Sequence, residues 1–138
     1  MGSYNIVVAD DHPSVRHILK VILSEGTGFQ VIGEAADGVA LLNLLSHLPR
    51  LPDMVILDQS MPRLNGTDAI RQINCLFPSI KVLMLTVHRD REYVSQAMNA
   101  GANGYLLKEK ADSEMFVAIQ SIRRGGTYIS PLVGHVLV

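Results

Sequence analysis

The stretch Val7-Val-Ala-Asp-Asp-His-Pro13 decides the fold, because it leads an apolar run through two adjacent carboxylates into a helical pattern. Residues 6–9 are all apolar, which is typical of a strand that is covered on both faces of a parallel sheet. Pro13 suits the first turn of a helix, and the apolar residues at positions 15 to 22 recur at helical spacing. The stretch therefore predicts a β-α unit with Asp10 and Asp11 at its junction.

The rest of the chain repeats this unit four more times. Further apolar runs occupy residues 29–32, 54–57, 82–85 and 105–107. Helical spacing of apolar residues recurs in segments 41–48, 69–77, 94–98 and 115–122, which end near Pro49, Pro78, Gly101 and Gly125. Right-handed crossovers then give a doubly wound α/β fold, in which a five-stranded parallel sheet carries helices on both faces. Asp37-Gly38 and Asn65-Gly66 are predicted to be turns.

Composition narrows the functional classes. The 138 residues fit one domain, and a net charge of -1 without a basic stripe argues against direct binding to nucleic acid. No apolar run approaches the roughly 18 residues of a membrane span, and the N-terminus lacks a signal-peptide pattern. The single cysteine, Cys75, fits a reducing cytoplasm, and its place on the third helix predicts a buried or half-buried side chain.

Polar side chains end four of the predicted strands. In an open α/β sheet, ligands bind beyond the carboxyl ends of the strands, so these side chains are expected on one rim. They are Asp10, Asp11, Asp58, Thr86 and Lys108.

Three neighbouring carboxylates repel one another unless a cation neutralises them. A ligand set made only of oxygen atoms suits a hard divalent ion, Mg²⁺ above all, with Mn²⁺ as the alternative. An ammonium and a hydroxyl beside the ion would complete a cradle for a phosphoryl group. Asp58, on the central strand, is the best candidate for a nucleophile that forms an acyl phosphate.

The chain resembles the receiver domain of two-component response regulators, over about residues 5–126. The resemblance rests on the motifs V-V-A-D-D-H, I-L-D-Q-S-M-P-R-L-N-G, L-M-L-T-V and G-A-N-G-Y-L-L-K, and D-D-H-P with the last of them indicates the NarL/FixJ class. It implies a flavodoxin-like sheet of order 2-1-3-4-5 and a receiver domain over residues 1–126. Residues 127–138 would begin a linker toward a C-terminal effector domain that this chain does not contain.

The resemblance also implies a role for each site residue. Asp58 would be the phospho-acceptor, Asp11 would bind Mg²⁺ directly, and Asp10 would bind it mainly through water. The backbone carbonyl of Ser60 would be a further ligand, and Lys108 would pair with the phosphoryl group. The remaining assignments are a switch formed by Thr86 and Tyr105, and three residues that tune the lifetime of the phosphoryl group, Ser60, Val87 and His88.

The implied function is a cytoplasmic signalling switch that accepts a phosphoryl group from a histidine kinase and is a regulatory domain rather than an enzyme. Phosphorylation would shift the face made by the fourth helix, fifth strand and fifth helix, and would control homodimerisation or a helix-turn-helix domain that binds DNA. No membrane partner is expected. One alternative is a pseudo-receiver that is never phosphorylated. The other is a phosphatase like the haloacid dehalogenases, which would want a second aspartate at the position of Ser60.

Overall fold

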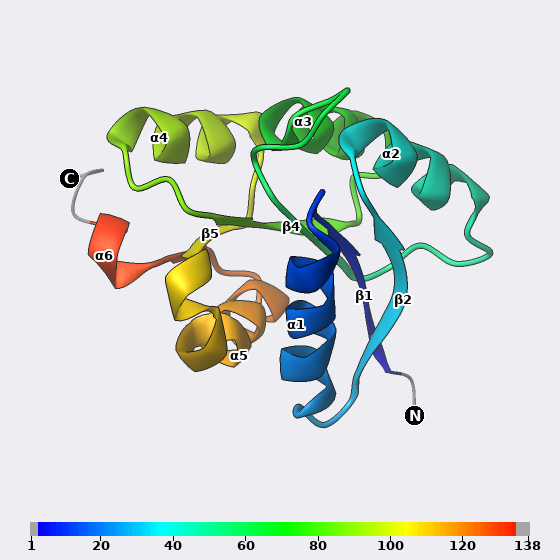
Figure 1. The fold of residues 1–138 in the computed structure, drawn as a ribbon, viewed down its shortest axis with the longest axis horizontal. Helices are drawn as coiled ribbons and strands as arrows, with labels where there is room; N and C mark the ends of the chain where they lie inside the picture. Colours follow the sequence, from blue (N-terminus) through cyan, green and yellow to red (C-terminus); the bar gives the residue numbers. More distant parts are fainter. Residues whose placement is uncertain (1–2, 135–138) are drawn as a thin grey trace.

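The computed structural model describes residues 3–134, in which strands and helices alternate (Figure 1). The strands are β1 (Tyr4–Ala9), β2 (Phe29–Ala35), β3 (Met54–Leu57), β4 (Lys81–Thr86), β5 (Gly104–Leu107) and β6 (Tyr128–Ile129). The helices are α1 (Pro13–Ser24), α2 (Gly38–His47), α3 (Gly66–Leu76), α4 (Arg91–Ala100), α5 (Ala111–Arg123) and the short α6 (Pro131–Gly134), with a 3₁₀ turn η1 (Lys108–Lys110) before α5. All five predicted β-α units are confirmed.

The sheet is parallel, and its strand order is β2-β1-β3-β4-β5-β6. The predicted order of the first five strands is confirmed, but the predicted count of five is wrong within the described residues. The sixth strand pairs Tyr128 with Gly104 and Ile129 with Tyr105. It was missed because two residues are too few to show any hydrophobic periodicity.

Helices cover the sheet on both faces, with α1 and α5 on one side and α2, α3 and α4 on the other (Figure 1). Along β3, Met54 and Ile56 pack in the core with α1 and α5, whereas Val55 and Leu57 pack in the core on the opposite face. All four side chains are fully buried. Each contributes roughly 1.5–3 kcal/mol by leaving water. Burial on both faces explains why the strand is apolar at every position.

Asp37 and Asn65 cap helices, so the two predicted turns are helix starts. The Asp37 carboxylate accepts a hydrogen bond from the Ala40 N–H at 2.8 Å, and the Asn65 side chain accepts one from the Asp68 N–H at 2.9 Å. These bonds satisfy N–H groups that have no partner inside the helix. The Cys75 expectation is wrong, because this side chain on α3 is exposed.

The segment after α5 returns to the edge of the sheet. The Ser130 N–H donates to the Tyr105 carbonyl at 2.9 Å, the Leu107 N–H donates to the Ser130 hydroxyl at 3.1 Å, and Val133 is fully buried. Residues 128–134 of the expected linker therefore pack on the domain, and residues 135–138 lie outside the described residues. No helix within residues 3–134 is long and apolar enough to cross a membrane.

Candidate functional site

The polar residues at the strand ends meet on one rim of the sheet. Parallel pairing places Ala9 beside Leu57 and Leu57 beside Met84, so that Asp10 follows β1 next to the position where Asp58 follows β3. Asp10 is 1% exposed and Asp58 is 5% exposed. Thr86, the last residue of β4, is fully buried. Burial of two carboxylates in one place requires a compensating charge.

Lys108 supplies that charge. It follows β5 at the start of η1, and its Nζ lies 2.8 Å from Asp10 Oδ2 and 3.4 Å from Asp58 Oδ1. The Lys108 side chain is 20% exposed, so the ammonium sits in the mouth of the site rather than in bulk water. The structure thus joins three of the five predicted strand-end residues through direct contacts.

The two carboxyl groups respond differently to the same ammonium. Burial acts to raise the pKa of Asp10, but hydrogen bonds from Lys108 and from the His12 N–H outweigh it and hold that pKa below its usual value. Burial raises the pKa of Asp58 above its usual value, Lys108 opposes the rise, and the nearby charge of Asp10 adds to it. Burial acts to lower the pKa of Lys108, yet its bonds to Asp10 and the charge of Asp58 raise it overall. Without a further cation, Asp58 is therefore the carboxyl group whose charged form is disfavoured by burial and by its charged neighbour.

Asp11 lies beside Asp10 and adds a third carboxylate to the rim. Its Oδ1 atom is buried and has no hydrogen-bond partner among the described residues, although the His12 Nδ1 atom lies 3.0 Å away. The same nitrogen lies 3.1 Å from Asp10 Oδ1. Potential ligand atoms of Asp10, Asp11 and His12 all lie within 4.8 Å of one another, whereas Asp58 joins the group through Lys108. A buried carboxylate oxygen without a hydrogen bond, beside other carboxylates, fits a hard cation such as Mg²⁺.

Thr86 and Tyr105 are linked through the backbone of His88. The His88 N–H donates to Thr86 Oγ1 at 3.2 Å, and the Tyr105 hydroxyl donates to the His88 carbonyl at 2.7 Å. Tyr105 is 1% exposed, and burial raises the pKa of its phenol, so the ring stays neutral inside the core. The predicted switch pair is therefore brought together, with His88 as the connection.

The three predicted lifetime residues meet at the loop after β4, which contains Val87 and His88 and is contacted by Ser60. Ser60 Oγ lies 3.3 Å from His88 Nε2, while Val87 is 66% exposed. The His88 ring also stacks on Tyr93 of α4, with centroids 4.0 Å apart and planes 9° apart. Sequence reasoning missed this stack. An aromatic residue shortly after His88 gave only a faint signal, because the contact depends on how the loop turns into α4.

Gln59, the residue that follows Asp58, bonds to the start of α3. Its side-chain oxygen accepts hydrogen bonds from the Thr67 N–H at 2.9 Å and from the Thr67 hydroxyl at 2.7 Å. The residue after Asp58 therefore anchors the loop to the first turn of α3. Gly66 allows this approach, because a Cβ atom there would collide with the Asp58 carbonyl.

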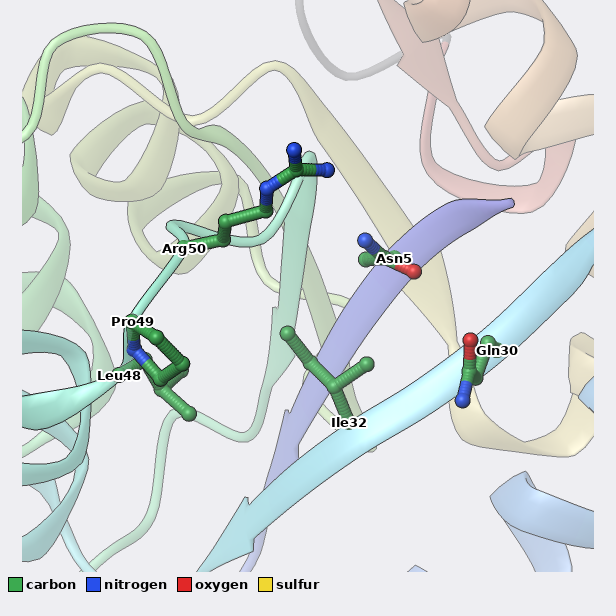
Figure 2. A pocket seen from close by; sticks show the side chains of 6 residues that line it. All are labelled: Asn5, Gln30, Ile32, Leu48, Pro49 and Arg50. Carbon is green, nitrogen blue, oxygen red and sulfur yellow. The ribbon is translucent and has the colours of Figure 1, made fainter. Parts of the chain in front are cut away.

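Figure 2 shows the residues that line a cavity of about 460 Å³, none of which belongs to this rim. It is lined near the start of β1 by Asn5, on β2 by Gln30 and Ile32, and after α2 by Leu48, Pro49 and Arg50. It holds none of the strand-end carboxylates and is not part of the site.

Most of the chain matches one known protein family. Residues 6–120 match the family described as the response regulator receiver domain. The chain belongs to this receiver family. The haloacid-dehalogenase alternative is thereby set aside. Receiver domains are regulatory parts of two-component systems, and this one has the parallel α/β fold of the family.

Curated relatives of this receiver are longer regulatory proteins. The transcriptional regulatory protein DegU of Brevibacillus brevis is 37% identical over 133 residues, which cover 96% of the chain and 56% of DegU. The oxygen regulatory protein NreC of Staphylococcus carnosus is 39% identical over 135 residues, which cover 96% of the chain and 61% of NreC. The chain thus spans somewhat more than half the length of the curated relatives that it matches.

Solved receiver domains share the fold along nearly their whole length. The isolated receiver of RcsB from Salmonella enterica serovar Typhimurium, solved with the phosphomimetic BeF₃⁻, has a TM-score of 0.88 and 28% identity, covering 98% of this chain and 99% of that one. The receiver of the putative response regulator NarL from Mycobacterium tuberculosis has a TM-score of 0.82 and 33% identity. The match covers 91% of this chain and 99% of that one. These neighbours agree with the NarL/FixJ class that the motifs indicate.

Proposed function

We propose that Asp58 accepts a phosphoryl group from a histidine kinase and that the resulting charge switches the domain. The observation that carries the proposal is the placement of Asp58. Its carboxylate is 5% exposed at the end of the central strand β3, and the Lys108 ammonium lies 3.4 Å from it. A nucleophilic carboxylate with a cation beside it is the minimal arrangement for forming an acyl phosphate.

The transfer is a displacement at phosphorus. An Asp58 carboxylate oxygen forms a bond to phosphorus while the P–N bond of a phosphohistidine breaks. The electron pair of that bond stays on the imidazole, which takes up a proton. With a small acyl phosphate as donor, the P–O bond breaks instead and a carboxylate leaves. Lys108 can stabilise the charge that the phosphoryl oxygens carry.

The residues present also fit a divalent cation. Asp10, Asp11, Asp58 and the Ser60 carbonyl would hold Mg²⁺, or Mn²⁺ in its place. Such an ion would neutralise the three carboxylates and draw charge from the phosphoryl oxygens. The buried Asp11 oxygen without a hydrogen bond supports this assignment.

The signal would pass through Thr86. Its hydroxyl now accepts the His88 N–H, and a bond to a phosphoryl oxygen would compete with that contact. Tyr105 holds the carbonyl of the same residue, so a change at Thr86 would reach β5 and the start of α4. Phosphorylation is then a shift between two populations, read out on the face formed by α4, β5 and α5.

The relatives support a proposal about the partners. Solved RcsB structures include two dimers bound to two parallel DNAs. By analogy, we infer a cytoplasmic protein in which the receiver of residues 1–126 leads through residues 127–138 to an effector domain. The altered face would then control a homodimer or DNA binding by that effector domain. The domain would catalyse only its own phosphorylation and the loss of that phosphoryl group.

The test is intact-mass spectrometry after incubation with acetyl phosphate, with and without Mg²⁺. We expect wild type to gain one phosphoryl group only when Mg²⁺ is present, and Asp58→Ala to gain none. Asp112→Ala, an exposed carboxylate in the first turn of α5, is the matched control and should gain the label. Labelling of Asp58→Ala would overturn the assignment. An unlabelled wild type, beside a control receiver that is labelled, would favour the pseudo-receiver.

A further inference from the structure

His88 makes four contacts around the site, although no strand or helix contains it. Its N–H donates to Thr86, and its carbonyl accepts the Tyr105 hydroxyl. Its ring bonds to Ser60 through Nε2 at 3.3 Å and lies flat on the Tyr93 ring. The backbone contacts fix where the residue sits, and the two ring contacts fix where the imidazole points.

The bond to Ser60 is a bridge between two loops. Ser60 stands two residues beyond Asp58, and His88 stands two residues beyond Thr86. Since β3 and β4 are neighbours in the sheet, these loops flank the Asp58 carboxylate on the side of β4. A side-chain bridge between them would narrow the path by which water could reach a group bound to Asp58.

The Ser60 bond alone holds the ring weakly. At 3.3 Å it is a long hydrogen bond, and Ser60 is exposed, so that water can compete for both partners. The stack on the half-buried Tyr93 ring is the second contact that fixes the His88 imidazole. Its centroid distance of 4.0 Å and its angle of 9° mean that the imidazole cannot swing away from Ser60 without losing the whole stacked face.

We propose that Tyr93 is a positioning residue, which keeps the His88 imidazole bridged to Ser60 and thereby slows hydrolysis of the phosphoryl group on Asp58. The inference rests on the proposed function of Asp58. In the hydrolysis, a water oxygen bonds to phosphorus and the bond from phosphorus to the Asp58 oxygen breaks. The carboxylate keeps the electron pair, inorganic phosphate leaves, and the proton of the water passes to solvent.

The experiment follows the decay of the phosphorylated protein by intact mass after the donor is removed. We expect Tyr93→Leu to shorten the lifetime roughly two- to tenfold, which is the range that loss of one aromatic stack allows. Tyr93→Phe keeps an aromatic face and should keep the lifetime of wild type. His88→Ala should shorten the lifetime at least as much as Tyr93→Leu.

The double variant separates positioning from general loosening. If Tyr93 acts only through His88, then Tyr93→Leu combined with His88→Ala decays no faster than His88→Ala alone. Melting temperatures check that each variant folds. Imidazole proton shifts of His88, measured by NMR without phosphorylation, should lose the ring-current effect in Tyr93→Leu and keep it in Tyr93→Phe.

Four results would overturn the inference. They are an unchanged or longer lifetime in Tyr93→Leu, equal shortening in Tyr93→Phe, additive effects in the double variant, and His88 shifts that ignore Tyr93. Each of them leaves the assignment of Asp58 intact, because wild type is labelled in every case. A wild type that takes no label would overturn both proposals together.

Discussion

The Lys108 ammonium lies closer to Asp10 than to Asp58, at 2.8 Å against 3.4 Å. The shorter contact of the lysine is thus to a residue that would bind metal, and the longer one is to the proposed phospho-acceptor. Asp10 is the more deeply buried carboxylate, and it is the one whose pKa the lysine helps to hold below its usual range. Before any phosphoryl group arrives, Lys108 therefore stabilises the fold by neutralising a buried charge.

We predict that Lys108→Met lowers the free energy of unfolding of the metal-free protein by about 3 kcal/mol, because it leaves Asp10 buried without its partner. Lys20 is the matched control, since it pairs with Glu34 at 2.7 Å but both side chains are partly exposed. Lys20→Met should cost less than about 1 kcal/mol. Urea denaturation in the presence of EDTA measures both. Equal losses would show that burial of the Asp10 pair does not matter.

Asp58→Asn should have the opposite effect and stabilise the metal-free protein at pH 7, on the order of 1 kcal/mol. The reason is that burial and the charge of Asp10 raise the pKa of Asp58 above its ordinary value of 3.8. As the pH falls, the folded protein therefore takes up this proton before the unfolded chain does. The advantage of the asparagine variant should shrink toward acidic pH. Denaturation midpoints across this range check the sign, and a destabilised variant at pH 7 would refute it.

We predict that the contribution of Tyr128 to the stability of the fold is lost in alkali. Burial, together with the hydrogen bond to Glu114 and its charge, raises the pKa of Tyr128 from 10.0 to about 12. The folded state thus holds this proton more tightly than the unfolded chain. The contribution is fully present below about pH 10 and is lost as the pH rises toward 12. The difference in unfolding free energy between wild type and Tyr128→Phe should therefore be constant below about pH 10 and fall above it. A difference that stays constant to about pH 11 would contradict this.

A substitution at Gly66 tests how tightly the loop after Asp58 is packed. A Cβ atom there would meet the Asp58 carbonyl and lie 2.8 Å from the Gln59 Cα atom, and neither backbone atom can move cheaply. Gly66→Ala should cost roughly 1–3 kcal/mol of stability and should slow labelling by acetyl phosphate.

Gly33→Ala is the comparison for this variant. Its Cβ atom would meet a methyl group of Leu44 at 3.0 Å, which is the far end of a flexible side chain. We therefore expect a smaller loss and unchanged labelling. Thermal melts and intact masses report both quantities. If the two variants behave alike, the close approach to Asp58 has no special role.

The sequence predicts what depends on local pattern. Uninterrupted apolar runs predict strands such as Met54–Leu57, because both faces of that strand are covered. The rim residues Asp10 and Asp58 follow from parallel strand order, which brings the carboxyl ends of the strands together. The helix starts at Asp37 and Asn65 could also have been predicted from the sequence, because Asp and Asn are both favoured N-cap residues.

Other features depend on contacts between distant segments. The strand at Tyr128 forms because β5 has a free edge and because the Ser130 hydroxyl is buried against that strand. The sequence of a two-residue strand reveals neither of these contacts. The exposure of Cys75 depends on the side of α3 that faces α4. The stack of His88 on Tyr93 requires one loop conformation among many. Such contacts appear only when the packed chain is known.

If Asp58 carries the phosphoryl group, chemical reduction can locate that group in the chain. The protein is labelled with acetyl phosphate and Mg²⁺, the acyl phosphate is reduced with borohydride, and tandem mass spectrometry maps the reduced residue. We expect reduction at position 58 alone, with Asp10 and Asp11 unmodified. Reduction at Asp10 or Asp11, or a label that survives borohydride on another side chain, would contradict it.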